Sequence, residues 1–347
     1  MTSIENEYVA YACKILGLAG EKTARMAIKA ITKGGSDRCF YRLSIGDGKS
    51  YLFMAYGRHQ EENAYWADIA AFLAALGVSV PAVYGHDPER GFVLMEDLGE
   101  RDLWSYRHEP WEVRRDLYRK VLKRISPLHT FAACSSNKGK RGVSADVSPP
   151  LPRAMKGYDR ELYRWEHDYF LTQFVGDVCG ISLAGREGTI LGEELESLAG
   201  RLLVTGPALV HRDLQSQNIM ICGGEPVFID FQGLRRGSLF YDLGSLLCDA
   251  YVPFTEEERD DLLRYAYELL NLDLDWTHFR EGFLDGSAQR LMQALGAFGF
   301  LGLKKGKKAF LGHIPRGIEN LCRMAAASGR LPELLKLAER CKGGRPK

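Results

Sequence analysis

Apolar and polar residues alternate with a short period in the first part of the chain. Two mainly apolar runs, 39–45 and 51–55, flank the turn Gly46-Asp47-Gly48, and this pattern predicts a β-hairpin. Apolar positions with helical spacing over Glu61–Leu76 predict a helix. Residues 31–97 are therefore expected to form a small sheet with one helix. The other elements expected here are strands at Val80–Tyr84 and Gly91–Met95 and a helical stretch over residues 1–30.

A helical period dominates after Asp97. Residues 137–152, which are rich in Ser, Pro, Gly and Lys, indicate an exposed loop. The sequence Thr255-Glu256-Glu257-Glu258 has the form of a capping box, so a helix is expected from there through Leu270. The remaining expectations are helices at Glu112–Leu128 and Tyr158–Phe174, short apolar runs at 208–210 and 227–229, and mainly helix after Tyr241.

Composition bounds the size and the partners of the molecule. A chain of 347 residues with 46% hydrophobic residues can fold as about two domains or as one large two-lobed unit. Its 46 Lys and Arg residues balance 45 Asp and Glu residues, which argues against a nucleic-acid-binding protein. No stretch approaches the ~20 apolar residues that span a bilayer. The eight cysteines are scattered without a Cys-x-x-Cys pair, as in cytoplasmic proteins.

One motif carries recognisable chemistry. Residues 211–218 read His-Arg-Asp-Leu-Gln-Ser-Gln-Asn and match the kinase catalytic-loop pattern H-R-D-L-x-x-x-N at every fixed position. Its Asp213 would accept or orient the hydroxyl that attacks the γ-phosphate of ATP. Asp230 follows the next apolar run, and together with Asn218 it offers hard oxygen ligands to Mg²⁺. The two motifs predict a phosphotransferase that uses Mg²⁺ and ATP.

Several segments together resemble a known family. The resemblance is to the aminoglycoside phosphotransferase and choline kinase group, and within it to the bacterial N-acetylmuramate/N-acetylglucosamine kinase branch. It implies an α+β, protein-kinase-like fold of two lobes, and a kinase that phosphorylates the anomeric hydroxyl of a cell-wall amino sugar in peptidoglycan recycling. The segments that carry it are Gly34–Arg38, Met95–Gly99, the catalytic loop, Ile229–Gln232, Tyr241–Leu243, Gln289-Arg290 and Ala294–Phe298.

The same resemblance implies roles for individual residues. Asp213 matches the catalytic base, and Asn218 and Asp230 match the metal ligands. The expected lobes are a nucleotide-binding part at 1–97 and a catalytic and substrate-binding part at 98–341, with a disordered tail at 342–347. The residues expected to hold the nucleotide are Gly34, Gly35 and Ser36 in the loop over the phosphates, Arg38 and Arg42 beside it, and Glu96, Asp97 and Leu98 in the hinge.

Two departures from the protein-kinase pattern change the picture. Gln232 stands where protein kinases have the glycine of Asp-Phe-Gly. No lysine occurs between Lys49 and Lys120, so the expected phosphate-binding lysine is missing. Either Arg38, Arg42 or Arg58 replaces it, or the activity is weak. If none of these arginines serves, backbone N–H groups and Mg²⁺ alone hold the phosphates. Only ten residues separate Asp230 from Tyr241, too few for the segment that orders a peptide substrate, so a small-molecule acceptor is expected.

The acceptor contacts are the least constrained part. Glu161, Trp165 and Asp168 could line a sugar pocket or form the solvated edge of an amphipathic helix. Gln289 and Arg290 could reach the substrate or cap the core, and Gln215 in the catalytic loop is a further candidate. Two other functions stay open: an aminoglycoside or choline-like phosphotransferase, and a non-catalytic nucleotide-binding regulator. The sequence leaves the oligomeric state open.

Overall fold

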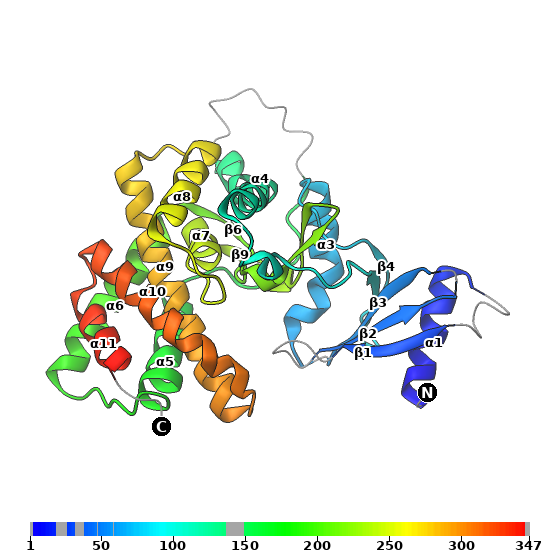
Figure 1. Ribbon diagram of the computed structural model, residues 1–347, viewed down its shortest axis with the longest axis horizontal. Coiled ribbons are helices and arrows are strands. Elements are labelled where there is room, and N and C mark those ends of the chain that lie inside the picture. The colour runs from blue at the N-terminus through cyan, green and yellow to red at the C-terminus, as the bar shows by residue number, and fades with distance from the viewer. Residues whose placement is uncertain are drawn as a thin grey trace.

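The structure is a computed structural model that describes residues 3–18, 26–31, 38–46, 48–57, 59–136 and 149–343. A five-stranded antiparallel sheet with the strand order β1-β2-β3-β5-β4 occupies one end of the molecule, and helices make up most of the other end (Figure 1). The strands of this sheet are β1 (Ala27–Ile31), β2 (Cys39–Ser44), β3 (Ser50–Ala55), β4 (Val83–Asp87) and β5 (Phe92–Glu96).

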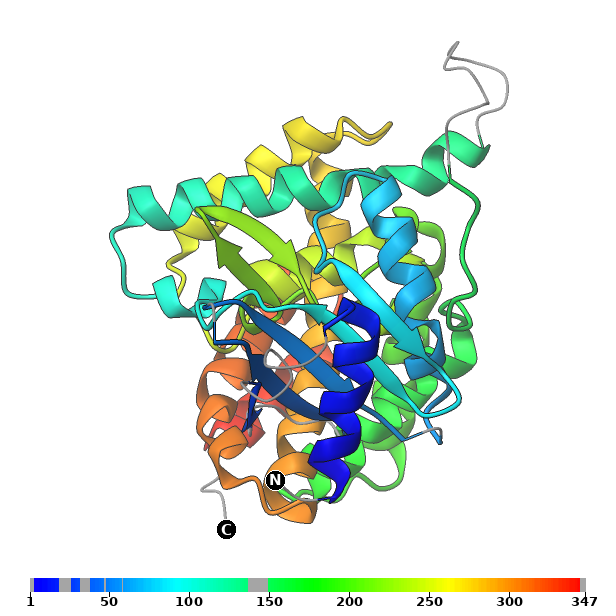
Figure 2. The same ribbon diagram turned by 90° about the vertical axis from the view of Figure 1, so that its right-hand side faces the viewer.

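Alternating side chains bury both faces of the sheet. Phe53 and Leu94 are paired across β3 and β5 and lie on the face that helix α1 (Ser3–Leu16) covers. Figure 2 shows α1 lying across that face. Their neighbours Met54 and Val93 point to the opposite face, where they join the core that contains helix α3 (Trp66–Ala75). A period of two along each strand therefore places the sheet between two helices.

The helical part is built around one long buried helix, α9 (Trp276–Gly299). Helix α7 (Leu239–Leu247) packs closely against it, because Gly286 of α9 meets the backbone of Phe240, and a Cβ at Gly286 would lie 2.4 Å from the Phe240 carbonyl oxygen. The other helices are α4 (Trp111–Ser136), α5 (Arg160–Phe170), α6 (Arg186–Val204), α8 (Glu256–Leu270), α10 (Ile314–Ser328) and α11 (Pro332–Gly343).

Two short antiparallel strand pairs lie between the sheet and these helices. One joins β6 (Pro207–Val210) with β9 (Arg235–Ser238), and the other is the hairpin of β7 (Ile219–Cys222) with β8 (Glu225–Phe228). Backbone hydrogen bonds tie the β7–β8 hairpin to the first part of the chain, from Phe228 N to Ser79 O and from Ile221 N to Arg101 O, both 2.8 Å. The segments 211–218 and 229–233, which flank this hairpin, are thereby fixed beside the junction of the two parts.

Most predicted elements are present, with some corrections. The hairpin at 39–55 and the capping box at Thr255 are confirmed. The helical stretch over residues 1–30 is wrong at its end, because Ala27–Ile31 forms the edge strand β1. The helix expected from Glu61 begins as a 3-10 turn (η1, Glu61–Tyr65) and is α-helical from Trp66.

Three further points concern the helices and the chain end. The long helix expected at 112–128 continues to Ser136. The expected tail is wrong at its start, because α11 extends to Gly343, and residues 344–347 lie outside the described part, as do 137–148 of the expected loop. Among the described helices, none combines the length and the apolar character that crossing a membrane requires.

Candidate active site

The loop between β6 and β7 carries the motif at 211–218 and is held in a strained conformation. Arg212 has a φ of 79°, in the left-handed region that a non-glycine residue rarely adopts. The buried carboxylate of Asp242, on α7, accepts hydrogen bonds from the backbone N–H groups of His211 (2.7 Å) and Arg212 (2.9 Å). His129 of α4 contacts the same carboxylate at 2.9 Å. These bonds fix the strained turn, so Asp242 anchors the loop.

A second buried carboxylate fixes the other end of the loop. Asp249 accepts hydrogen bonds from the backbone N–H (2.8 Å) and the hydroxyl (2.6 Å) of Ser216. Its other oxygen accepts one from the backbone N–H of Tyr251 at 2.9 Å. Burial raises the pKa of Asp249 above its ordinary value, even though these donors favour the charged form. The catalytic loop is thus held at both ends by groups that the sequence motif does not include.

Asp213 lies between these two anchors and is open to the cleft. Its side chain is 34% exposed, and its Oδ1 accepts a hydrogen bond of 2.9 Å from Arg290. The amide nitrogen of Asn218 donates to the backbone carbonyl of Asp213 at 3.0 Å, which turns the Asn218 Oδ1 away from the loop. Among the described residues, no donor contacts Asp213 Oδ2, so this oxygen is available to an incoming hydroxyl.

Asp230 meets the catalytic loop from β8. The backbone N–H of Ile229 donates to the carbonyl of Asn218 at 3.0 Å, which places Asp230 next to the loop. Asp230 itself has a left-handed backbone with φ of 64°. Its Oδ1 accepts hydrogen bonds from Arg38 and, at 2.9 Å, from Gln232. Burial raises the pKa of Asp230, but the Arg38 charge and these bonds outweigh it, so the pKa lies below its ordinary value.

The donor set fits Mg²⁺. Asp230 Oδ2 accepts no hydrogen bond from the described residues. Asn218 uses its amide nitrogen to donate to the loop, and its Oδ1 likewise accepts no hydrogen bond from the described residues. Both are hard oxygen ligands, and Mg²⁺ is commonly held by one or two such groups together with substrate phosphates. The described residues contain no cluster of three or more His, Cys, Asp or Glu that would suit a protein-only metal site.

The expected nucleotide contacts divide between two places. Arg42 does not approach Asp230: its guanidinium binds Asp97 (2.7 and 3.1 Å) and Glu100 (2.8 Å) at the hinge. Arg38 is the arginine that reaches Asp230. The carbonyl of Leu98 accepts from the Cys222 thiol at 3.3 Å, and its N–H meets no acceptor in the described residues. Gly34, Gly35, Ser36 and Arg58 lie outside the described residues.

The structure also places the expected acceptor residues on α5. Trp165 is 51% exposed and stacks on Tyr169, with ring centroids 5.2 Å apart. Asp168 is exposed on the same helix, and Glu161 is exposed with its carboxylate 3.6 Å from Lys156. These positions fit the solvated-edge alternative for the two acids and leave Trp165 as an exposed aromatic face.

Gln289 requires a correction, whereas Arg290 does not. Gln289 is fully buried, and its amide binds Glu166 (3.0 Å) and His167 (2.8 Å), so it braces α9 against α5 and does not reach the cleft. Arg290, one residue later, points to the other side and contacts Asp213 and, at 3.4 Å, Gln215. Gln289 therefore follows the alternative in which it caps the core. Arg290 lies in the candidate site, beside Asp213 and Gln215.

Sequence reasoning missed a buried carboxylate beneath the loop. Glu166 accepts hydrogen bonds from the hydroxyls of Tyr158 (3.0 Å) and Tyr241 (3.1 Å), and from the side-chain amide of Gln289. Burial raises its pKa although the nearby Arg212 charge lowers it. The available signal was the helical period of α5, which puts Tyr163, Glu166 and Phe170 on one buried face. An acidic residue on an apolar face indicates a partnered charge.

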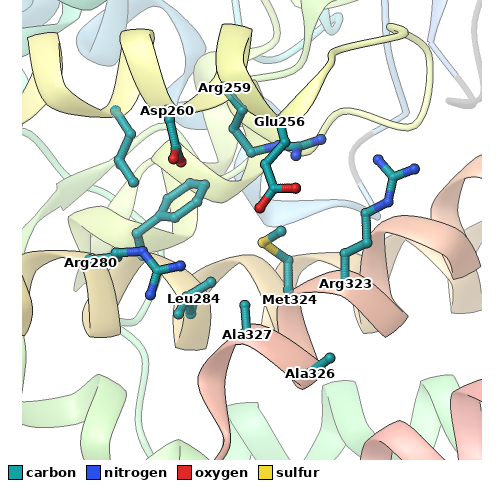
Figure 3. A pocket seen from close by; sticks show the side chains of 11 residues that line it. Glu256, Arg259, Asp260, Arg280, Leu284, Arg323, Met324, Ala326 and Ala327 are labelled. Atoms are coloured by element: carbon teal, nitrogen blue, oxygen red, sulfur yellow. The ribbon is translucent and has the colours of Figure 1, made fainter.

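A separate hollow lies on another side of the helical part. It has a volume of about 430 Å³ and lies between α8, α9 and α10 (Figure 3). Its lining mixes acids such as Glu256 and Asp260 with Arg280 and Arg323. None of the candidate site residues lines it, so it does not belong to the catalytic loop.

Known proteins are similar to this chain in sequence over most of its length. The profile of a family described as the phosphotransferase enzyme family matches residues 27–280. A curated N-acetylmuramate/N-acetylglucosamine kinase from Pseudomonas aeruginosa is 28% identical over 309 residues, which cover 88% of this chain and 84% of the relative.

Two solved structures give the likeness in three dimensions. A choline kinase from Streptococcus pneumoniae has a TM-score of 0.61 at 14% identity, with 93% of this chain and all of that chain covered. The ADP-bound aminoglycoside phosphotransferase APH(2'')-Ib has a TM-score of 0.53 at 13% identity, with coverage of 92% and 98%. At such identities the likeness is one of fold, and the predicted α+β, protein-kinase-like fold is confirmed.

Proposed function

The chain belongs to the phosphotransferase enzyme family, and from this premise we propose that it transfers the γ-phosphate of ATP to the anomeric hydroxyl of N-acetylmuramate, N-acetylglucosamine or both. The observation that carries the proposal is the convergence of Asp213, Asn218 and Asp230 at one place, supported by the names of the curated relatives. A role in peptidoglycan recycling and a cytoplasmic location follow as parts of the same proposal.

Asp213 would act on the acceptor. Its available Oδ2 would receive the hydrogen bond of the sugar hydroxyl, orient its oxygen toward the γ-phosphate, and take its proton as the bond to phosphorus forms. An anomeric hydroxyl is more acidic than an ordinary alcohol, so a carboxylate is a sufficient base for it. The fixed loop supports this role, because Asp242 and Asp249 leave the backbone around Asp213 little freedom to move.

Asn218 and Asp230 would hold Mg²⁺, which supplies neutralisation of the charge on the phosphates when bound. Adenine would lie against the hinge, where the N–H of Leu98 is available as a donor. The loop that contains Gly34, Gly35 and Ser36 would cover the phosphates. Arg38 would take the part of the missing lysine, since its guanidinium is the one that reaches the metal-binding end of the cleft.

The acceptor would be a monosaccharide. The segment between Asp230 and Tyr241 is short and consists of η5 (Phe231–Gly233), β9 and the start of α7, which leaves no platform for a peptide. Trp165 and Tyr169 together offer an exposed aromatic face, and such faces stack on sugar rings. With Arg290 and Gln215 beside Asp213, the polar groups that would orient the sugar are close to the reacting hydroxyl.

Transfer assays with defined acceptors test the proposal. The enzyme is incubated with Mg-ATP and either N-acetylmuramate, N-acetylglucosamine, choline or kanamycin, and the phosphate is located by ³¹P NMR. A 1-phosphate on one or both amino sugars is expected, and Asp213→Asn should abolish it. Phosphate on carbon 6, or transfer only to choline or kanamycin, would contradict the proposal. Nucleotide binding without transfer to any acceptor would favour a non-catalytic regulator.

A further inference from the structure

The acceptor end of the site contains a fixed positive charge. Arg290 is 6% exposed, and four of its five N–H groups have acceptors within the site. Nε donates to the Ser245 hydroxyl at 3.2 Å, and Nη1 donates to Gln293. Nη2 is shared between Asp213 Oδ1 and Gln215 Oε1. Because these partners come from α7, α9 and the catalytic loop, the guanidinium cannot move away without breaking several bonds at once.

This charge is permanent and poorly screened. A guanidinium keeps its proton in proteins, and the Tyr241 ring lies beside it, with the ring centroid 6.0 Å from the guanidinium carbon. Burial reduces screening by water and salt, so a like charge placed nearby is repelled and an opposite charge is attracted. The acceptor hydroxyl has to bind Asp213, whose Oδ1 is only 2.9 Å from Arg290. Every acceptor that binds Asp213 therefore lies close to the positive charge of Arg290.

Arg290 can also contact the acceptor. Its fifth N–H, the second hydrogen of Nη1, has no acceptor among the described residues. Arginine N–H groups donate hydrogen bonds to carboxylate and sugar oxygens, whereas the positive charge of the guanidinium repels an ammonium group. Of the carboxylates near Arg290, Asp249 is engaged by Ser216. Asp213 keeps Oδ2 for the acceptor hydroxyl, but Arg290 at its Oδ1 balances its charge, so neither carboxylate forms an uncompensated acidic site for a cationic acceptor.

We propose that Arg290 selects the acceptor by charge: it favours carboxylate-bearing and neutral sugars and excludes acceptors that carry an ammonium group near the reacting hydroxyl. The inference rests on the proposed sugar kinase function and deepens it. It distinguishes this site from those of enzymes that phosphorylate choline or aminoglycosides, whose substrates are cations. Arg290 is then a specificity residue that touches both the acceptor and the carboxylate that orients it.

Three sugars that differ mainly in charge test the inference. N-acetylmuramate is anionic, N-acetylglucosamine is neutral, and glucosamine is cationic when assayed at about pH 6.5. The value of kcat/KM is measured for each with wild type, Arg290→Gln and Arg290→Lys. Ratios between sugars within one preparation do not depend on the fraction of folded enzyme. They are also insensitive to a general loss of Asp213 positioning, which lowers every acceptor alike.

In Arg290→Gln the cationic-to-neutral ratio should rise at least about tenfold, and the anionic-to-neutral ratio should fall by a similar factor. Arg290→Lys keeps the charge, so both ratios should stay near those of wild type even if kcat falls. Arg259→Gln is a matched control, because Arg259 of α8 is also a buried arginine but donates to the Leu247 carbonyl at the end of α7. It should leave both ratios unchanged.

The outcomes separate this inference from the proposed function. Unchanged ratios in Arg290→Gln, or equal changes in Arg290→Lys, would show that Arg290 only positions Asp213 and would overturn the inference. The same ratios are measured as dissociation constants by calorimetry. A wild type that binds the sugars with this charge preference but phosphorylates none supports the inference and contradicts the proposed function. A wild type that binds all three equally overturns the inference.

Discussion

Arg38, which immediately precedes β2, donates a hydrogen bond from its guanidinium to the Asp230 carboxylate across 192 positions of sequence. The Arg38 side chain is 8% exposed, so this largely buried contact joins the start of β2 to the segment that follows β8. Arg42, four residues later, binds Asp97 and Glu100 at the hinge instead. The two arginines therefore carry their charges to different places, and only Arg38 lies where it could take the part of the missing lysine in the proposed nucleotide site.

The first prediction separates these two arginines. Arg38→Ala should raise the KM for ATP and the dissociation constant of ADP by about tenfold or more, because a charge-assisted contact to phosphate is lost. Arg42→Ala is the matched control, and it should change either value by less than about threefold. Nucleotide binding is measured by calorimetry and KM by a coupled assay. An equal effect of the two substitutions would contradict the assignment of Arg38.

The second prediction concerns Asp230. Asp230→Asn removes the charge of the proposed metal ligand while keeping its shape, so turnover should fall by about 10² or more. The variant should still fold, with a lower free energy of unfolding because the ion pair with Arg38 is lost. Raising the Mg²⁺ concentration should recover part of the loss. Asp87→Asn, which removes an acidic partner of Arg90 at the far end of the sheet, is the control for lost charge. Wild-type turnover in Asp230→Asn would remove Asp230 from the metal site.

Local patterns in the sequence predicted the hairpin, the capped helix and the catalytic motif because each is specified within a few neighbouring residues. The turn at Gly46–Gly48 and the capping box at Thr255 are local hydrogen-bonding solutions. Strand β1 was missed because Ala27–Ile31 is short and lies at the sheet edge, and its pairing with β2 depends on the tertiary fold.

The motif indicated candidate reacting residues but could not predict which groups hold them in place. Asp249 and Glu166 lie outside the motif, and their roles depend on helices α5, α7 and α9 meeting beneath the loop. The same reasoning left Gln289 and Arg290 undecided, since adjacent residues on a helix point about 100° apart. Packing of α9 sends Gln289 into the core and Arg290 toward Asp213.

The third prediction tests the anchor of the catalytic loop. Asp242→Asn replaces one acceptor oxygen with an amide that cannot accept, so a buried backbone N–H of His211 or Arg212 loses its partner. The free energy of unfolding should fall by about 1–3 kcal/mol, and kcat should fall more than the KM for ATP rises. Urea denaturation and steady-state kinetics measure both. Asp261→Asn, in an exposed ion pair with Arg119, should change neither.

The fourth prediction is a pH dependence. Burial raises the pKa of Glu166 in the native state, so the native protein holds a proton at pH values where the unfolded chain has released it. The contribution of Glu166 to stability is therefore greatest below its unfolded pKa of about 4.3 and declines as the pH rises through the window up to the raised native pKa. Glu166→Gln removes this titration.

The difference in unfolding free energy, Glu166→Gln minus wild type, should consequently shift in favour of the variant as the pH rises from about 4.3 through the raised native pKa. Urea denaturation at several pH values measures the difference. Glu161→Gln, on the exposed face of the same helix, controls for the loss of one carboxylate. A difference that is constant with pH would show that Glu166 is charged in both states across this range.

The last prediction concerns the aromatic face of α5. Trp165 is half exposed, lies at 10° to the Tyr169 ring, and is not needed to fill the core. If the sugar stacks on this face, Trp165→Ala should raise the KM for N-acetylglucosamine by up to about tenfold, because aromatic stacking contributes up to about 1.5 kcal/mol. The KM for ATP should stay within about twofold, since the proposed adenine contact is at Leu98 and not on α5. Tyr84→Ala removes another exposed aromatic side chain, on β4, and should change neither constant. Trp165→Phe should recover most of the sugar affinity, because it restores an aromatic ring at the same position. A rise in the KM for ATP, or no change for the sugar, would place the acceptor elsewhere in the cleft.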